Sequence, residues 1–308
     1  MKRIAFLILL PLFSQTLIAQ EQAEKHSSSS ELLLQISTLS EAKLGFTQRF
    51  SFPFFQGSSP LTEDNNIAFA LTAEISPISL NGLAEAVWTP IAFFQLAAGG
   101  RIGSGWNINI FGADVYGIGL NRADANGKSE NSGSAFDGLL WKAQGGGAVQ
   151  FDLAAIVPGD WHHVVFRSYH EINHKGYTRA AKNESWYFEN DAGENCNGFN
   201  YYGNFLLGYQ MPIFFNFIAF LAEMDLYLYD TTGRESWGDE LLRWTFSGIF
   251  GFDITKKFSI SATAQFRTQR NFNESNWDDL YYRNRTLDTK DKLRLEFYRV
   301  ALGLTYKF

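Results

Sequence analysis

The chain has 308 residues, of which 45% are hydrophobic and 19% are charged, and these proportions exclude a mainly disordered or collagen-like protein. Its single cysteine excludes a disulfide framework, and its formal net charge of −6 argues against nucleic-acid binding through a basic surface. Aromatic residues reach 16% of the chain, so the position of these side chains needs an explanation.

The first residues have the layout of an export signal. Lys2 and Arg3 precede an apolar run over 4–13, and small or polar residues then lead to Ala19. This order predicts a secretory signal peptide over 1–19 that is cleaved after Ala19. The serine-rich start of the mature chain predicts a flexible periplasmic lead-in over 20–40.

Apolar and polar residues alternate along most of the remaining chain. Phe258, Ile260 and Ala262 share one face of a run in which Ser259 and Ser261 occupy the other. A period of two is the pattern of a β-strand with one oily and one polar face. The runs last about 9–11 residues, which suits a tilted strand across a membrane. In lipid an open sheet edge would leave unpaired amides. We therefore expect an all-β fold, a closed antiparallel transmembrane barrel over 41–308.

The connections set the expected number of strands. Four short turns are predicted at 89–92, 157–161, 211–215 and 253–257, and five long polar loops at 55–65, 107–135, 172–199, 230–240 and 271–291. They predict about ten strands, with short periplasmic turns and long extracellular loops. The alternative is twelve strands: 66–88 divides at Ser76-Pro77, and 106–120 becomes a further strand.

The C-terminal segment Tyr298-Arg-Val-Ala-Leu-Gly-Leu-Thr-Tyr-Lys-Phe308 resembles the last strand of Gram-negative outer-membrane β-barrels. The resemblance implies an outer-membrane location and a contact with the barrel-assembly machinery. The residues that would be read by that machinery are Tyr298, Val300, Leu302, Leu304, Tyr306 and Phe308. Thr89-Pro-Ile-Ala-Phe-Phe94, together with Gly99-Gly-Arg-Ile-Gly-Ser-Gly-Trp106, also resembles uncharacterised barrels of treponemes and related spirochaetes.

The polar faces of the expected strands carry charges of both signs. In a narrow barrel such charges should pair, because a lone desolvated charge is costly. The residues expected to line the lumen are Arg49, Glu85, Arg101, Lys142, Asp152, Arg167, Glu223, Asp225, Arg267 and Arg299. The aromatic residues expected at the two membrane interfaces are Trp88, Trp106, Trp141, Tyr209, Trp244, Tyr306 and Phe308.

The segment His170-Glu-Ile-Asn-His174 matches the H-E-x-x-H zinc motif letter for letter. That motif needs a helix, on which the two histidines meet on one face. Here it follows an alternating run, and four residues of a strand span about 13 Å, so we expect no metal ion. A hydrolase site near the outer rim is a further hypothesis, but no nucleophile is evident beside His170.

Three functions follow from these patterns, in descending order. The first is a narrow porin-like passage with a largely salt-bridged lumen, and the second is a non-enzymatic surface barrel that acts as an adhesin, a ligand-binding protein or a structural protein through its long loops. Exposed aromatic residues such as Trp277, Tyr281 and Tyr282 suit recognition of that kind. The third is an outer-membrane hydrolase. We expect no catalytic residues, metal or cofactor, and the expected partners are outer-membrane lipid, the assembly machinery and a small solute or extracellular ligand.

Overall fold

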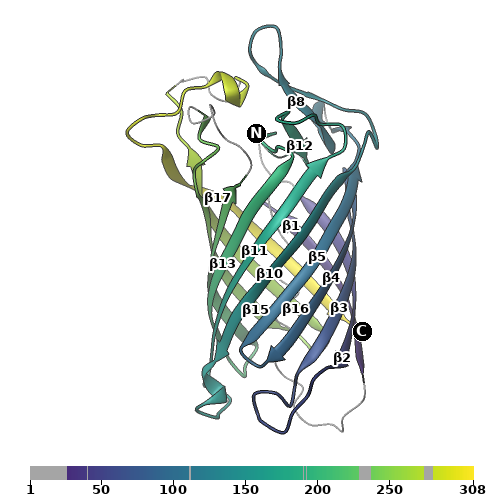
Figure 1. Cartoon of the computed structure of the whole chain (residues 1–308), viewed down its shortest axis with the longest axis vertical. Coiled ribbons are helices and arrows are strands. Elements are labelled where there is room, and N and C mark those ends of the chain that lie inside the picture. The colour runs from purple at the N-terminus through teal and green to yellow at the C-terminus, as the bar shows by residue number, and fades with distance from the viewer. Residues whose placement is uncertain are drawn as a thin grey trace.

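A computed structural model describes residues 26–39, 41–110, 112–189, 191, 193–228, 237–273 and 280–308. The expected signal peptide and Trp277 lie outside these residues. Within the described residues, twelve antiparallel strands close into one barrel (Figure 1). They are β1 (Ser27–Ser37), β2 (Ala42–Pro53), β3 (Asn66–Ser76), β4 (Ser79–Ile91), β5 (Phe94–Gly105), β10 (Leu140–Asp152), β11 (His163–Tyr177), β13 (Gly198–Gln210), β14 (Phe215–Tyr227), β15 (Arg243–Asp253), β16 (Phe258–Arg270) and β17 (Leu293–Lys307).

The remaining elements are short and belong to the connections. They are β6 (Ile108–Ile110), β7 (Ala113–Val115), β8 (Ile118–Ala123), β9 (Ser129–Ser132), β12 (Trp186–Phe188) and the 3-10 turns η2 (Leu153–Ala155) and η4 (Tyr282–Asn284). No helix in the described part of the chain is long and apolar enough to cross a membrane.

The all-β, closed antiparallel barrel is confirmed, but the preferred number of ten strands is wrong. The first missing strand is β1, which lies within the segment that we expected to be a flexible lead-in. Leu32 pairs with Phe46 of β2 on one side and with Tyr306 of β17 on the other. Without β1, the facing edges of β2 and β17 would have no partner, so closure of the barrel requires this strand.

The second missing strand comes from the division of 66–88. β3 and β4 meet at a tight turn in which Ser76 pairs with Ser79, and Pro77 lies in that turn, where no ladder donor is needed. The twelve-strand alternative had this division right but assigned 106–120 wrongly. That segment contains β6, β7 and the start of β8, all of them outside the barrel.

The extra first strand changes the end of the barrel at which one connection lies. We call the end at which β1 begins and β17 ends the base, and the opposite end the mouth. Because β1 runs from the base to the mouth, β2 returns to the base, and the connection 54–65 lies there although we expected it among the long outer loops. The described parts of the long connections 106–139, 178–197, 228–242 and 271–292 all lie at the mouth (Figure 1).

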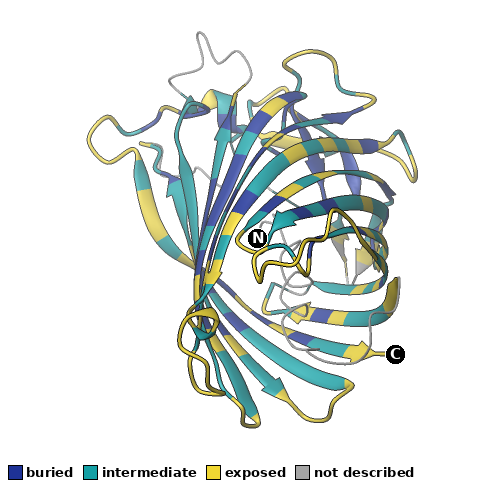
Figure 2. Ribbon diagram, turned by 60° about the horizontal axis from the view of Figure 1, so that its bottom comes forward, coloured by how far each residue is buried: buried dark blue, intermediate teal, exposed yellow. Residues whose placement is uncertain are grey.

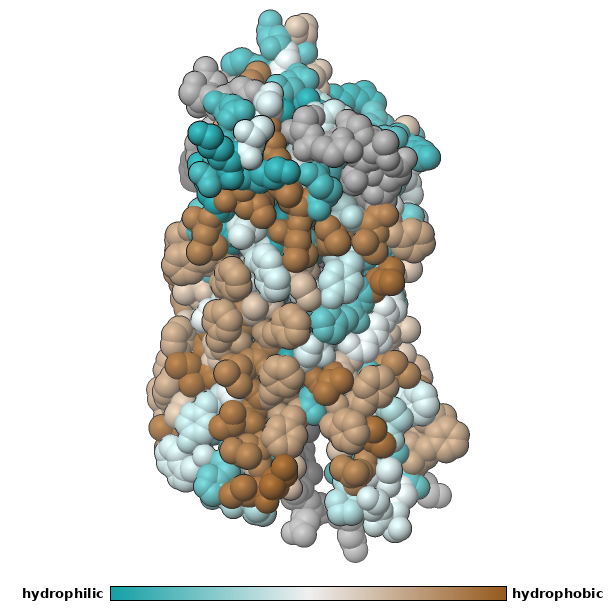
Figure 3. Space-filling model, turned by 60° about the vertical axis from the view of Figure 1, so that its left-hand side comes forward, coloured by the Kyte–Doolittle hydropathy of each residue, from teal (hydrophilic) through white to brown (hydrophobic). Residues whose placement is uncertain are grey.

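Side chains divide cleanly between the two sides of the barrel wall. On β17, Val300 and Leu302 are 37% and 42% exposed, whereas their neighbours Arg299 and Ala301 are 1% and 6% exposed. Buried and exposed residues therefore alternate along the strands (Figure 2). On the face shown in Figure 3, hydrophobic side chains form a broad band below a hydrophilic mouth, and large hydrophobic residues are exposed on strands all round the barrel. A water-soluble sandwich would bury these side chains, so the band is the surface of a barrel that spans a membrane.

One residue of the C-terminal strand departs from its expected face. A register shift opposite Gln265 and Phe266 inserts an extra residue at this point of β17. Tyr298 is consequently buried, and the guanidinium of Arg267 lies 3.9 Å from its ring centroid. The outward alternation expected from Tyr298 to Phe308 therefore begins only at Val300.

The substitution Ile36→Arg tests whether β1 belongs to the barrel. Ile36 is 47% exposed and pairs with Leu302 of β17. A charge at this lipid-facing position should lower the free energy of unfolding by about 2–4 kcal/mol. Urea titration of the protein refolded in phospholipid vesicles measures the change, and Ile36→Val is the apolar control. Equal stability of the two variants would contradict the assignment of β1.

Candidate site in the barrel interior

The mouth is partly filled by the connection between β11 and β13. Its strand β12 pairs with β8, which also pairs with β9, so the connection belongs to a three-stranded sheet at the mouth. Trp186 and Phe188 of β12 pack with Ile118, Leu140 and Tyr177 in a buried cluster. This packing fixes the position of the next residue, Glu189.

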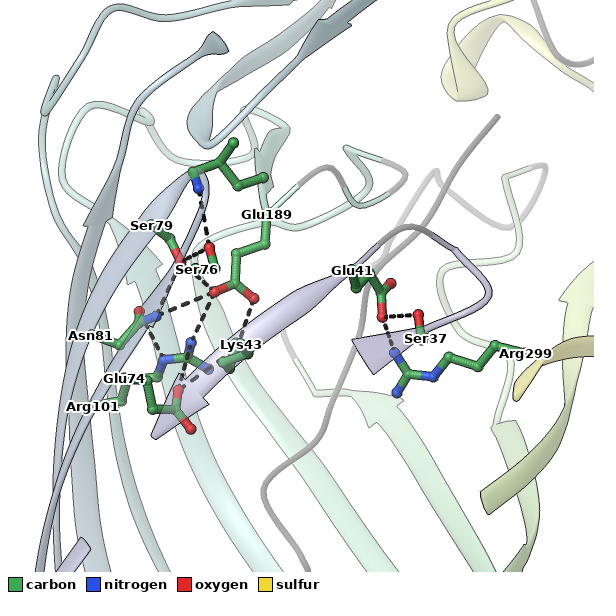
Figure 4. A network of polar contacts seen from close by, with 11 residues as sticks. Ser37, Glu41, Lys43, Glu74, Ser76, Ser79, Asn81, Arg101, Glu189 and Arg299 are labelled. Carbon is green, nitrogen blue, oxygen red and sulfur yellow. Dashed lines mark hydrogen bonds and ion pairs between the residues drawn. The ribbon is translucent and has the colours of Figure 1, made fainter. Parts of the chain in front are cut away.

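Glu189 extends from this connection into the barrel and is 5% exposed. Its backbone has a φ of +51°, which is unfavourable for a residue other than glycine. Its carboxylate accepts hydrogen bonds from Ser79 Oγ at 2.5 Å and from Asn81 Nδ2 at 3.2 Å (Figure 4). The polar contacts of the side chain therefore offset the free-energy cost of the unfavourable backbone conformation at Glu189.

Two cations hold the same carboxylate. Lys43 Nζ lies 3.0 Å from Glu189 Oε2, and Arg101 Nη2 lies 3.7 Å from Oε1 (Figure 4). Glu74 lies 3.7 Å from Lys43 and 3.6 Å from Arg101, which completes a cluster of two positive and two negative groups. Burial opposes the ionisation of Glu189, but the two cations and the Ser79 hydroxyl outweigh it and hold its pKa below the ordinary value. We call these four charged residues the mouth cluster.

A second network joins the first turn of the barrel to its last strand. Glu41, in the β1–β2 connection, accepts hydrogen bonds from Ser37 and from Arg299 (Figure 4). Arg299 Nε also donates to Gln265 at 2.6 Å, and Gln265 donates to Ser247 at 2.9 Å. This chain of buried polar groups crosses from β1 to β15 next to the seam at which β1 meets β17.

Carboxylates on the neighbouring walls are also satisfied by partners. Glu171 accepts from Lys142 at 2.6 Å and from the Tyr169 hydroxyl at 2.8 Å. Glu223 accepts from the Tyr202 hydroxyl at 2.8 Å. The Lys142 and Tyr202 contacts link strands that are adjacent in the barrel, and the Tyr169 contact lies within β11, so this part of the interior is polar and hydrogen-bonded.

The residues that we expected in the lumen are distributed over several of these networks. Arg101, Lys142, Glu223 and Arg299 have the contacts described above. Asp152 lies 2.7 Å from His163, and Arg267 lies 3.9 Å from Glu296. Asp225 pairs in register with Arg243, and Arg49 and Glu85 pair with Ala70 from its two sides. The Arg167 guanidinium lies 5.0 Å from the ring centroid of Tyr169.

Sequence reasoning missed three members of the mouth cluster. Lys43 and Glu74 occupy inward-facing positions in the alternating pattern of β2 and β3, so the alternation could have identified them. Glu189 lies in a connection without a periodic pattern, and only its packing directs it into the barrel.

The expected interfacial aromatics form contacts near the two ends of the wall. Trp141 stacks on His174 with ring centroids 4.7 Å apart, and Trp244 stacks on Phe246 at 5.9 Å. At the base, Trp88 contacts Phe54 and the Tyr209 hydroxyl donates to the Trp161 carbonyl, while Tyr306 contacts Phe308. Trp106 follows β5 in the mouth connection and contacts Phe136.

The H-E-x-x-H segment lies entirely within β11. His170 and His174 are each two residues from the exposed Ile172 and point to the same face of β11, whereas Glu171 is buried on the opposite face. The three side chains therefore do not converge. Among the described residues, no three His, Cys, Asp or Glu side chains are grouped closely enough to hold a metal ion.

Comparison with known proteins gives little beyond the fold class. No family model matches the chain, and no curated protein matches it. One solved structure that it resembles is a KdgM porin, with 9% sequence identity and a TM-score of 0.38 over 92% of this chain and 99% of the porin. The functional argument is therefore built on the residues of this chain.

The connection that carries Glu189 should be more stable in acid than in base. Asp191 accepts hydrogen bonds from Gly193 and Asn195, but its burial dominates and raises its pKa to about 7. A carboxyl with a raised folded pKa binds more protons when folded, so stability falls as the pH rises from about 4 to about 7. Hydrogen exchange should therefore show faster local opening of 178–197 at pH 8 than at pH 5. Asp191→Asn should remove this difference, and an unchanged difference in that variant would contradict the assignment.

Proposed function

We propose that the protein is an outer-membrane β-barrel that forms a narrow passage for small polar solutes. In the resting state, the connection 178–197 is held in the mouth by Glu189. The observation that carries the proposal is the reach of this one carboxylate, from a loop, to Lys43 of β2 and Arg101 of β5.

The size and chemistry of the interior support a passage. A barrel of twelve strands is intermediate in width. Side chains can fill the interior of an eight-stranded barrel, whereas the 16–18 strands of general porins leave an aqueous channel. The interior presents charged and amide side chains rather than an apolar core. Buried networks such as those of Glu171 and Arg299 narrow the path without making it hydrophobic.

The mouth connections interlock, which supports a closed resting state. Lys128 forms a bridge with Leu280, and the hydroxyls of Tyr281 and Tyr282 both lie 3.0 Å from Ser185 Oγ. Tyr282 is only 3% exposed, although it belongs to the segment that suggested surface recognition. Loops that pack on one another in this way favour a closed mouth over a free binding surface.

Export and assembly complete the proposal. A signal peptide over 1–19 would direct the chain to the periplasm. The assembly machinery would read the C-terminal strand, whose outward residues Val300, Leu302 and Leu304 border the seam with β1. We expect the hydrophobic band to lie in the outer membrane and the base, with its shorter connections, to face the periplasm.

Removal of the Glu189 carboxylate should open the passage. Glu189→Ala leaves Lys43 and Arg101 with Glu74 as their only partner in the mouth cluster, so the connection loses its anchor and the mouth gains positive charge. We expect a several-fold higher single-channel conductance in planar bilayers, with a shift towards anion selectivity. Glu184→Ala is the matched control, because Glu184 lies in the same connection and pairs with the exposed Arg122. Absence of conductance in every variant would overturn the proposal.

A further inference from the structure

Three polar side chains lie on the lipid-facing side of the barrel, away from the interior networks. On β11, Ser168 and His170 have the parity of Phe166 and Ile172, which are 41% and 56% exposed. On β13, Tyr201 has the parity of Phe199 and Leu207, which are 56% and 57% exposed. Polar groups at lipid-facing positions are costly, so a cluster of three calls for an explanation.

The three side chains form a continuous hydrogen-bonded chain. Ser168 Oγ lies 2.8 Å from His170 Nε2, and His170 Nδ1 lies 2.6 Å from the Tyr201 hydroxyl. The rings of His170 and Tyr201 are nearly parallel, with an interplanar angle of 19° and centroids 6.0 Å apart. A hydroxyl nucleophile, an imidazole base and a third group that orients the imidazole are the parts of an acyl-transfer site.

From the sequence we expected no nucleophile beside His170, but Ser168 lies within hydrogen-bond distance of it. Two residues apart on a strand, Ser168 and His170 point to the same face, so the spacing S-x-H was the available signal. The parity also separates both residues from the buried Glu171, which belongs to the interior.

Glycines stand opposite the imidazole on both neighbouring strands. His170 pairs in register with Gly147 of β10 and with Gly203 of β13. A Cβ atom on Gly203 would lie 3.0 Å from both His170 Nδ1 and the Tyr201 hydroxyl, which is too close for the hydrogen bond to persist unchanged. Further along β10, a Cβ on Gly145, which pairs with Ile172, would meet no atom within 4 Å, so the outer wall has room for an acyl chain next to Ile172.

We propose that Ser168 and His170 are the catalytic residues of an acyl-ester hydrolase that acts on lipids dissolved in the bilayer, with Tyr201 as a positioning residue. The outward positions of β10, β11 and β13 carry no Asp, Glu, Lys or Arg, so the site suits a neutral ester rather than a charged headgroup. This site is on the outside of the wall and is independent of the passage through the barrel.

The reaction follows from the two nitrogen atoms of the imidazole. Nδ1–H donates to the Tyr201 oxygen, which leaves Nε2 free to accept the Ser168 proton as Oγ attacks the ester carbonyl. The alcohol leaves with that proton, and the acyl group remains on Ser168. Water, deprotonated by Nε2, then attacks the acyl-serine, Ser168 Oγ leaves with the proton from Nε2, and the carboxylic acid is released.

A lipophilic fluorophosphonate tests the site directly, because it labels only a serine that is activated by a base. The refolded protein in phosphatidylcholine vesicles should be labelled at Ser168, and it should release acid from a long-chain p-nitrophenyl ester. Ser168→Ala should abolish both, and His170→Ala should slow labelling at least 100-fold. Ser30→Ala is the matched control, since Ser30 is an outward serine that is hydrogen-bonded to Gln48 and should leave labelling unchanged.

Further measurements separate catalysis from folding. Tyr201→Phe should lower the maximal labelling rate about tenfold without changing the probe concentration at half-maximal rate, since only the orientation of the imidazole is altered. Heat-dependent gel mobility checks that each variant is a folded barrel. Labelling of folded Ser168→Ala at the wild-type rate, or of folded His170→Ala at that rate, would overturn the proposal, whatever the conductance of the protein.

Discussion

The structure depends on the requirement that no strand edge remain unpaired in lipid. A lone backbone amide in hydrocarbon costs several kcal/mol, so the sheet must close. Closure occurs where β1 meets β17, with Leu34 opposite Leu304 and Ile36 opposite Leu302. Outward side chains on both strands are apolar at this seam, and the Arg299–Glu41 contact lies on its inner side. The same pairing therefore joins the two ends of the chain and separates the lipid face from the interior.

Closure also brings charged side chains together in the narrow interior of the barrel. A buried ion that loses its partner is strongly destabilising, so each inward charge needs a neighbour. The strands supply most partners, as Lys142 does for Glu171. At the mouth, Lys43 and Arg101 share Glu74, and the second negative charge comes from a loop. Because loops open at lower free energy than barrel strands, this dependence on a loop residue is the basis of the opening that we propose for the mouth.

The alternation of residues predicted the class of fold, since the side-chain period of two distinguishes the faces of every strand. It failed at the ends of elements. The four serines of 27–30 suggested a linker, although they begin β1. They have no hydrophobic side chains, and the apolar pattern starts only in the later part of the strand, at Leu32 to Ile36. The turn at Pro77 was visible in the sequence, but a proline can mark either a turn or a bulge. Glu189 could not be predicted, since its role depends on long-range packing of β12 on β8.

The lipid-facing cluster shows why strand parity is informative beyond the fold. On β11, every second residue from Arg167 to Asn173 is buried and has polar atoms, and such residues are expected inside a wet barrel. Ser168 and His170 are the exceptions on the other parity, where selection for stability alone would place apolar side chains as it does at Phe166 and Ile172. Their mutual hydrogen bond and the one to Tyr201 reduce the cost of exposure to lipid but do not remove it. Gly203 adds to the cost, since a strand glycine contributes no packing. These residues weaken the wall at one place, and together they present a nucleophile, a base and an orienting hydroxyl. Chemistry on the lipid-facing side of the wall explains them more readily than the demands of the barrel do.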